Sequence, residues 1–447
     1  MDCITRSARS GLLVASLGRT MPAAIAGSGV ALALDCMGSL LTVGHDTPSK
    51  GVVEAARRAL LTPDGACANA FLSSVCDSIY VHVPFCRHRC HYCDFFTIAG
   101  RDDARSAYVD ALLREAQGTI PGLPMVEPTL FVGGGTPTYL PAVDLDRLLR
   151  GVRASMAVEP VEWTVEANPE TVDAEIADVL CGAGVTRVSL GMQSAQPKLL
   201  QALERQHDPE SVPRAVSYLR DAGLTSLSLD LIFGIPGQTL RQVEADLEAA
   251  LALEPVHLSV YGLVYEPGTP LRRRRDKGLV LQVDESLEAD MYTCVQGRLA
   301  AAGFEQYEIS NWALPGHRCR HNEVYWTNGN WWPLGPAAAG HVRGLRWRNI
   351  PRLGTWLETD GFSPVTDIEQ VDLDGQLGES LMLGLRLLDG VPRALVNAAC
   401  ATPLRGANRA RAIERHIESG LVRWCGEVLA LTREGLLLGD VVIGDLL

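Results

Sequence analysis

The sequence predicts an α/β protein whose main body is a partial, TIM-type (β/α)6 barrel. From residue 79 onward, short runs rich in β-branched residues alternate with amphipathic stretches of helical periodicity. Each interval between successive runs is long enough for one helix and its turns, which is typical of parallel strands joined by right-handed crossovers. Six such units occur, fewer than the eight of a closed barrel, and functional side chains are expected where their strands end.

The individual elements follow from this alternation. The expected strands are Ile79–Pro84, Thr129–Gly133, Glu162–Ala167, Arg187–Met192, Ser226–Phe233 and His257–Val264. The expected helices between them are Ala107–Gln117, Asp144–Met156, Asp173–Ala183, Glu210–Ala222 and Leu240–Leu253. Further along, helices are expected at Gly378–Leu388 and Ala407–Ser419, followed by a hairpin from residue 420 to residue 432. This last pattern resembles a winged-helix domain without a concentrated basic face, so we expect a cap or a partner surface.

The chain divides into four parts. Residues 1–76 are an N-terminal extension that we expect to be poorly ordered; arginines ahead of an apolar stretch resemble a signal peptide, but Asp35 interrupts the stretch. Residues 77–310 form the barrel, residues 311–375 close it, and residues 376–447 form the winged-helix-like domain. No other uncharged apolar run approaches the length of about 20 residues that a transmembrane helix needs.

Three cysteines crowd into one short loop after the first strand. Cys86, Cys90 and Cys93 have the spacing C-x3-C-x2-C. Three thiolates can ligate three irons of a [4Fe–4S] cluster and leave the fourth iron open for a cofactor or substrate. The alternative is a structural zinc loop completed by His88, His91 or a distant ligand, but zinc sites usually show two pairs of ligands and no second pair follows. The spacing therefore favours an iron–sulfur cluster.

The ends of the next strands carry groups suited to a cofactor. Residues 131–137 (F-V-G-G-G-T-P) bring three glycines, whose lack of Cβ atoms lets the backbone approach a ligand and present its amides. Glu166 and Gln193 lie where burial without a partner would be costly. Arg205 offers a fixed charge suited to a carboxylate, and Asp230 is an acid within an apolar strand, suited to ribose hydroxyls. Each one alone could equally be a satisfied polar group at a strand end.

The cysteine spacing, with the aromatic Tyr92 just before Cys93, resembles the radical S-adenosylmethionine (SAM) superfamily. The resemblance implies a radical SAM barrel with a [4Fe–4S] cluster and S-adenosyl-L-methionine as cofactors. It assigns Cys86, Cys90 and Cys93 to the cluster, and Gly134, Gly135 and Thr136 to the amino group of SAM. It implies further cofactor contacts at Tyr80, Tyr92, Glu166, Gln193, Arg205 and Asp230.

The order of the motifs over residues 78–447 is similar to the oxygen-independent coproporphyrinogen III oxidase-like family, which includes true oxidases and HemW-type haem chaperones. Two features favour the chaperone branch. True oxidases usually carry another cysteine two positions after the third cluster cysteine, where this chain has Phe95. The segment His321-Asn-x-x-Tyr325-Trp326 resembles the signature of the HemW type, where it is associated with haem.

The resemblance makes haem the expected cargo, and the residues supply candidate contacts. Six of the eight tryptophans fall between Trp312 and Trp356, a density that could supply flat surfaces for a porphyrin. His321 is the candidate axial ligand, expected over the open lateral side of the barrel near the cluster loop. The alternative is that the tryptophans are core residues and His321 is a hydrogen-bonded structural residue.

Two functions follow. The first is a HemW-like haem chaperone that delivers haem to an unidentified haem-requiring enzyme; the second is an oxygen-independent coproporphyrinogen III oxidase. The formal charge of −13 argues against a broad phosphate-binding surface, so no nucleic-acid partner is expected. The positive run Arg272–Arg275 allows at most a peripheral membrane contact. A metal or redox centre points to a reducing compartment, so we expect a cytoplasmic protein.

Overall fold

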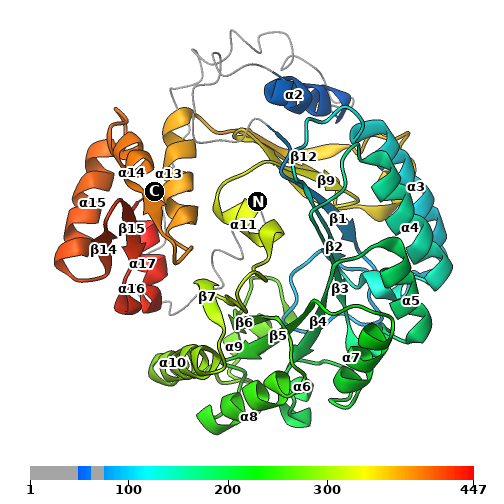
Figure 1. Ribbon diagram of the computed structural model, residues 1–447, viewed down its shortest axis with the longest axis horizontal. Helices are drawn as coiled ribbons and strands as arrows, with labels where there is room; N and C mark the ends of the chain where they lie inside the picture. Colours follow the sequence, from blue (N-terminus) through cyan, green and yellow to red (C-terminus); the bar gives the residue numbers. More distant parts are fainter. Residues whose placement is uncertain (1–48, 62–74, 447) are drawn as a thin grey trace.

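The computed structural model describes residues 49–61 and 75–446 and confirms the predicted α/β class. Its main feature is a 12-stranded sheet with the order β12-β11-β10-β9-β1-β2-β3-β4-β5-β6-β8-β7. Strands β1 to β6 are neighbours in chain order and pair in parallel, so they form the predicted six-unit partial barrel. They curve into an arc whose outer side is covered by helices (Figure 1).

The six parallel strands begin within one residue of their predicted starts: β1 (Ser78–Val83), β2 (Thr129–Gly134), β3 (Glu162–Ala167), β4 (Arg187–Gln193), β5 (Leu227–Phe233) and β6 (His257–Gly262). The crossover helices are α3 (Arg105–Thr119), α4 (Ala142–Ser155), α5 (Ala174–Ala183), α6 (Pro197–Ala202), α7 (Ser211–Asp221) and α8 (Leu240–Leu251). Most residues of these strands are buried, as expected for parallel strands that are covered on both faces.

Both edges of the parallel sheet are extended. After α9 (Pro270–Asp276) and α10 (Glu285–Ala301), the strand β8 pairs antiparallel with β6, whereas β9 pairs parallel with β1 on the opposite side. The predicted closing segment 311–375 therefore contributes to both edges. The added elements are β7 (Glu305–Glu308), β8 (Asn311–Ala313), α11 (Arg320–Trp326), β9 (Trp331–Leu334), β10 (Ala339–Val342), β11 (Leu345–Asn349), α12 (Leu353–Leu357) and β12 (Val365–Gln370). Helix α11 lies inside the arc (Figure 1).

Part of the N-terminal extension is ordered. Residues Ser49–Leu61 form helix α2, so the expectation of poor order is wrong for this segment. Its apolar face is buried in the main core through Val52, Val53, Ala56 and Leu60. This amphipathic spacing explains the order, because such a helix gains stability when one face packs against the body. Of the rest of the predicted extension, residues 1–48 and 62–74 lie outside the described residues, whereas Cys76 is described and buried.

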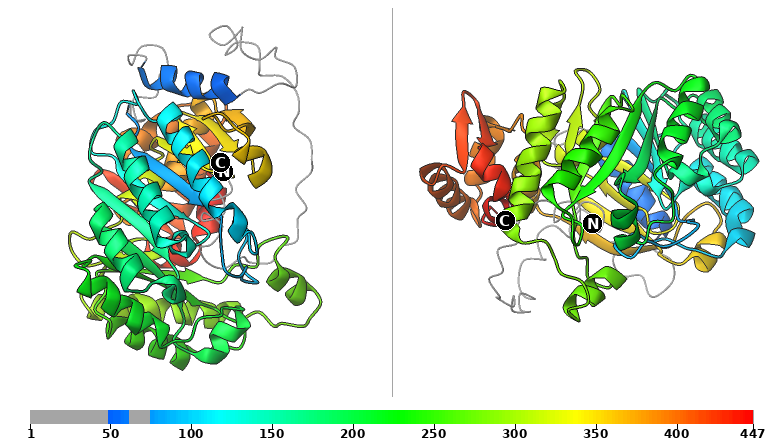
Figure 2. Two further views of the ribbon diagram at one scale, coloured as in Figure 1. Left: turned by 90° about the vertical axis from the view of Figure 1, so that its right-hand side faces the viewer. Right: turned by 90° about the horizontal axis from the view of Figure 1, so that it is seen from below.

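The C-terminal module stands beside the barrel (Figures 1 and 2). Within the described residues it combines five helices with a small sheet of order β13-β15-β14 around its own apolar core, which is the predicted winged-helix-like arrangement. Its elements are α13 (Leu373–Gly384), β13 (Val391–Pro392), α14 (Arg393–Cys400), α15 (Gly406–Glu418), β14 (Val422–Cys425), β15 (Val428–Leu431), α16 (Arg433–Leu437) and α17 (Gly439–Gly444). Across residues 49–61 and 75–446, none of the helices has the length and apolar character needed to cross a bilayer.

Candidate functional site

One cavity of about 420 Å³ inside the arc brings the candidate residues together. Its wall includes the loop after β1, the ends of β2 to β5 and helix α11. Every site residue suggested by the sequence lines it: Tyr80, Cys86, Cys90, Tyr92, Cys93, Gly134, Gly135, Thr136, Glu166, Gln193, Arg205, Asp230 and His321. The barrel topology explains the convergence, because parallel strands place their carboxyl ends, and the loops that follow, at one edge.

The cysteine loop is held in shape by its own backbone. The Cys86 N–H donates to the Ile98 carbonyl (3.0 Å), and the Cys93 N–H donates to the Cys90 carbonyl (3.2 Å). Two neighbouring side chains reach the sulfur atoms. The Thr136 hydroxyl lies 3.5 Å from Cys86 Sγ, and Arg205 Nη1 lies 3.7 Å from Cys90 Sγ. The loop therefore presents three thiols to the cavity beside a fixed positive charge.

The donor set fits an iron–sulfur cluster. Within the described residues, no three Cys, His, Asp or Glu side chains form a group that could hold a single metal ion. A [4Fe–4S] cluster has no such requirement, because each thiolate binds a different iron and three cysteines leave the fourth iron open. Burial raises the pKa of Cys86 to about 11 and that of Cys93 to about 12. Bound iron would supply the positive charge that the thiolate forms need.

The glycine turn after β2 packs closely against the start of the cysteine loop. A Cβ atom on Gly135 would lie 2.7 Å from the carbonyl oxygens of Val83 and Phe85, and Gly134 has a φ of +104°. The sequence-based expectation that these amides face a ligand is wrong. The Gly135 N–H donates to the Val83 carbonyl and the Thr136 N–H donates to the Phe85 carbonyl. Both amides are therefore used to attach the turn to β1 and to the residues that follow it.

Two partly buried acids lie close to this turn. Glu166 Oε2 accepts from the Gly134 N–H (2.9 Å), and burial raises the pKa of Glu166 to about 7. Asp230 Oδ1 accepts from the Ser189 hydroxyl (2.9 Å), and burial raises its pKa to about 6. Both carboxylates would gain from donors brought by a ligand, such as an ammonium group or ribose hydroxyls.

Arg205 is positioned by groups on two strand ends. Its Nη2 donates to Asn168 Oδ1 (2.8 Å) and to the Gly191 carbonyl (2.7 Å). Its buried Nε has no hydrogen-bond partner within the described part of the chain, so the guanidinium retains donor capacity for a carboxylate. Nearby, Gln193 adopts a φ of +64° at an irregularity in the β4–β5 register, which redirects the end of β4 at the cavity.

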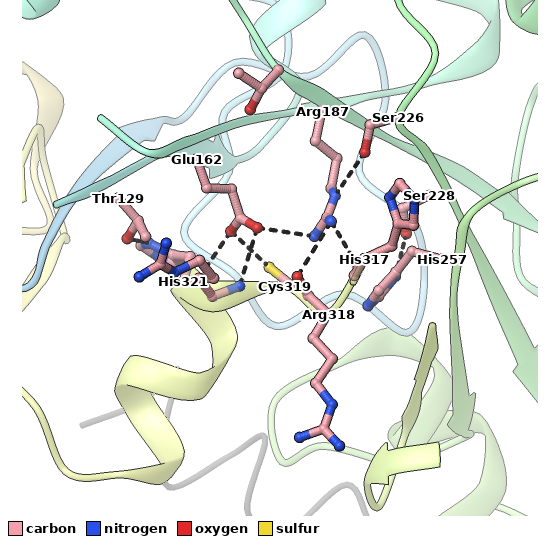
Figure 3. A network of polar contacts seen from close by, with 12 residues as sticks. Thr129, Glu162, Arg187, Ser226, Ser228, His257, His317, Arg318, Cys319 and His321 are labelled. Carbon is pink, nitrogen blue, oxygen red and sulfur yellow. Dashed lines mark hydrogen bonds and ion pairs between the residues drawn. The ribbon is translucent and has the colours of Figure 1, made fainter. Parts of the chain in front are cut away.

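A buried polar network fixes α11 at the opposite ends of the strands (Figure 3). The Glu162 carboxylate, at the start of β3, accepts from the backbone N–H groups of Arg320 (3.1 Å) and His321 (3.0 Å). Arg187, at the start of β4, lies 3.3 Å from Glu162 and donates to the His317 carbonyl (2.7 Å). Glu162 therefore satisfies the first amides of α11, and Arg187 compensates its charge.

The position predicted for His321 is wrong. The ring lies between the starts of β1 and β2, 2% exposed, rather than over the lateral opening of the barrel. Its Nδ1 is hydrogen-bonded to Ser78 Oγ (2.5 Å) and Thr129 Oγ1 (3.1 Å), and its Nε2 to the Tyr325 hydroxyl (2.8 Å). The ring also stacks on Phe131 at 4.6 Å. Burial lowers the pKa of His321 to about 3, so it is neutral with both nitrogens occupied.

Comparison with known proteins places this architecture in a family. Residues 80–250 match the radical SAM superfamily, and residues 371–438 match the HemN C-terminal domain. The chain is 39% identical over 379 residues to the heme chaperone HemW of Mycobacterium tuberculosis (strain CDC 1551 / Oshkosh), covering 83% of this chain and 94% of that protein. The heme chaperone HemW of Bacillus subtilis (strain 168) is 35% identical over 377 residues, covering 83% of this chain and 99% of that protein. This chain belongs to the HemW family.

The HemW assignment confirms the branch that the sequence favoured, and radical SAM membership implies a [4Fe–4S] cluster and SAM. The heme chaperone HemW of Escherichia coli (strain K12) is 34% identical over 371 residues, covering 80% of this chain and 95% of that protein. The solved structure of coproporphyrinogen III oxidase (HemN) from Escherichia coli has a TM-score of 0.72 at 20% identity, covering 88% of this chain and 93% of that chain. This last similarity confirms the fold.

Within this HemW-family chain, the clustered tryptophans are mostly core residues. The six between Trp312 and Trp356 are all buried, and among them only Trp326 lines the cavity. The expectation of a broad aromatic surface for a porphyrin is therefore wrong, because edge strands and helices cover the other rings. Trp332 packs edge-on against Trp347 at 5.5 Å.

Sequence reasoning missed three residues that shape the site. Asn168 links Arg205 to Thr136, whose hydroxyl it contacts at 3.1 Å. It stands two positions after Glu166 in the Glu-Ala-Asn-Pro motif, so its place at a strand end was a usable signal. Glu162 and Arg187 gave no such signal, because their partners on α11 and just before it lie more than a hundred residues away in the chain.

Proposed function

We propose that this chain is a cytoplasmic haem chaperone that binds one haem as cargo and passes it to a haem-requiring enzyme. The observation that carries the proposal is the membership of the HemW family, with the His-Asn-x-x-Tyr-Trp segment placed on α11 at the wall of the cavity. Phe95 agrees with this function, because the chain lacks a further cysteine two positions after Cys93.

The resident cofactors would occupy the other end of the same cavity. Cys86, Cys90 and Cys93 would hold the cluster, which supplies single electrons when bound. Arg205 would bind the carboxylate of SAM through its remaining donor capacity. Glu166 would accept from the amino group, and Asp230 would accept from ribose hydroxyls. The assignments to Arg205, Glu166 and Asp230 use partly buried cavity-lining groups that keep hydrogen-bonding capacity for a ligand.

Haem would contact the α11 side of the cavity. Tyr325 and Trp326 line it and would add apolar contact area. Both ring nitrogens of His321 are hydrogen-bonded within the protein. His321 can therefore bind iron through Nε2 only after the Tyr325 hydroxyl releases that nitrogen. Haem binding through His321 therefore requires a local rearrangement of α11.

Two variants test this assignment by haem titration of the cluster-loaded protein. If His321 is the ligand, His321→Ala weakens binding by at least about tenfold. Tyr325→Phe keeps the ring and removes the competing hydroxyl, so it retains or increases the affinity. An unchanged dissociation constant in His321→Ala would remove this residue and leave His317 or His341 as the next candidates. Iron content should remain unchanged in both variants, since neither residue is assigned to the cluster.

The competing function is tested by product analysis. Under strong reduction with SAM, we expect little or no conversion of coproporphyrinogen III propionates to vinyl groups. Multiple-turnover vinyl formation, together with an absence of saturable haem binding, would reverse the proposal and make the chain an oxidase.

A further inference from the structure

A buried arginine of the C-terminal module contacts the helix that lines the cavity. Arg386 follows α13, and its side chain is 1% exposed. The guanidinium carbon lies 5.0 Å from the centroid of the Trp326 ring, within the range of a cation–π contact. On another side, Nη1 lies 3.8 Å from Asp440 Oδ1 of α17.

The charge of Arg386 is balanced by the barrel as well as by its own module. Burial lowers the pKa of Arg386, whereas the buried Glu308 carboxylate and the partly buried Asp440 carboxylate oppose this shift. Glu308 lies on β7, and its backbone forms a bridge to Leu387, the residue after Arg386. The guanidinium therefore sits where β7, α11 and α17 meet, in a place where both its charge and its planar shape have partners.

Trp326 carries this contact to the cavity. It is the last residue of α11, 3% exposed, and packs against Leu383 and Leu387 of the module. It also lines the cavity, and its buried Nε1 has no hydrogen-bond partner in the part of the chain that the structure describes. The C-terminal module therefore contacts the Trp326 ring, and the same residue forms part of the cavity wall.

Further contacts show that the module supports this region as a unit. Asn328, just after α11, donates from Nδ2 to the Ser380 hydroxyl of α13 (3.1 Å). Just before α11, Arg318 Nη1 lies 2.5 Å from Asp389. Helix α11 is thus fixed to the barrel through Glu162 and to the C-terminal module at both of its ends.

We propose that Arg386 is a positioning residue for haem: it orients Trp326 at the cavity wall without touching the haem itself. This inference rests on the proposed function. Because this cation–π contact is buried and desolvated, the loss of Arg386 removes a strong orienting interaction from one face of the Trp326 indole. The C-terminal module then has a defined role, which is to set the affinity of the cavity for its cargo.

The test is haem titration of the full, cluster-loaded chain with two substitutions. Arg386→Met removes the charge and should weaken haem binding at least about tenfold, whereas Arg386→Lys keeps the charge between Glu308 and Asp440 and should weaken it about threefold. The matched control is Arg393→Met. Arg393 makes a similar contact, 3.9 Å from the Trp424 ring, but lies on the exposed side of the module, so its loss should leave the affinity unchanged.

A double-mutant cycle separates positioning from a general loss of stability. In a Trp326→Leu background, Arg386→Lys should cause no further loss of haem affinity, because the ring through which it acts is absent. Melting curves and iron content are recorded in parallel. If Arg386→Met fails to fold, the haem affinity of Arg386→Lys alone tests the positioning role.

The outcomes distinguish this inference from the proposed function. Absence of saturable haem binding in the wild type overturns both. Wild-type binding with an unchanged affinity in Arg386→Lys and Arg386→Met overturns the positioning role alone. The same is true if Arg386→Lys weakens binding equally with and without Trp326.

Discussion

The ends of the cavity differ in how far the hydrogen-bonding capacity of the side chains proposed to bind ligands is already used. At the carboxyl ends of the strands, Arg205 Nε has no hydrogen-bond partner among the described residues. Burial raises the pKa values of Glu166 and Asp230 there. At the amino ends, Glu162 and His321 make full sets of hydrogen bonds to α11 and the barrel. The first end therefore keeps hydrogen-bonding capacity for a ligand, whereas at the second end the Tyr325 hydroxyl must release His321 Nε2 before that nitrogen can bind iron.

Removal of a cluster cysteine gives the largest expected effect and tests the first end. Cys86→Ala, Cys90→Ala or Cys93→Ala should abolish most of the bound iron, because each removes one of the three protein ligands that we propose for the cluster. Cys181→Ala, Cys294→Ala and Cys400→Ala serve as controls and should keep it. Iron and sulfide analysis after anaerobic reconstitution measures the effect. Full [4Fe–4S] loading in a variant lacking all three loop cysteines would contradict the superfamily chemistry at this end.

Disruption of the buried ion pair should give the largest loss of stability at the second end. Arg187→Met leaves the Glu162 carboxylate buried without its counter-charge, so we expect the free energy of unfolding to fall by about 3 kcal/mol. Urea unfolding measures this loss. The exposed pair Arg272–Asp276 is the matched control, and Arg272→Met should cost less than about 1 kcal/mol. Equal losses in the two variants would mean that the Glu162–Arg187 pair does not hold α11.

The pH dependence of stability isolates His321. Its folded-state pKa of about 3 lies below the unfolded value of about 6.5, so its stabilising contribution is complete above that value and is lost as the pH falls. The difference in unfolding free energy between wild type and His321→Gln should therefore shrink by about 1.4 kcal/mol per pH unit below about 6.5. The raised pKa values of Glu166 and Asp230 act in the opposite direction but cancel, because both proteins share them. A difference that stays constant on acidification would place His321 in contact with solvent.

The smallest expected effect concerns the hydroxyl that occupies His321 Nε2. Tyr325→Phe removes the hydrogen bond of 2.8 Å to His321 Nε2, so the free energy of unfolding should fall by about 1 kcal/mol. A loss several times larger would show that the α11 end is more rigid than proposed, and that the rearrangement needed for iron binding is correspondingly costly.

The contrast between the two ends also explains what the sequence could predict. The strand starts, the cysteine loop and groups such as Glu166 and Asp230 follow from local patterns. Parallel strands bring their carboxyl ends to one edge of the sheet, so a residue at a strand end is already placed near the site. His321 was misplaced because its environment is set by Ser78, which lies 243 residues away in the chain. Helix α2 and Arg386 were missed for the same reason. Only the tertiary structure shows that the apolar face of α2 packs on the main core and that Arg386 is buried against Trp326.

The central claim is that one cavity carries two separable sites, for the cluster at one end and for haem at the other. Haem titration into the wild type and into the variant lacking Cys86, Cys90 and Cys93 tests it most directly. We expect saturable binding of one haem per chain in both proteins, with affinities within about threefold of each other. Absence of saturable haem binding in the wild type, or its loss together with the cluster, would contradict the account.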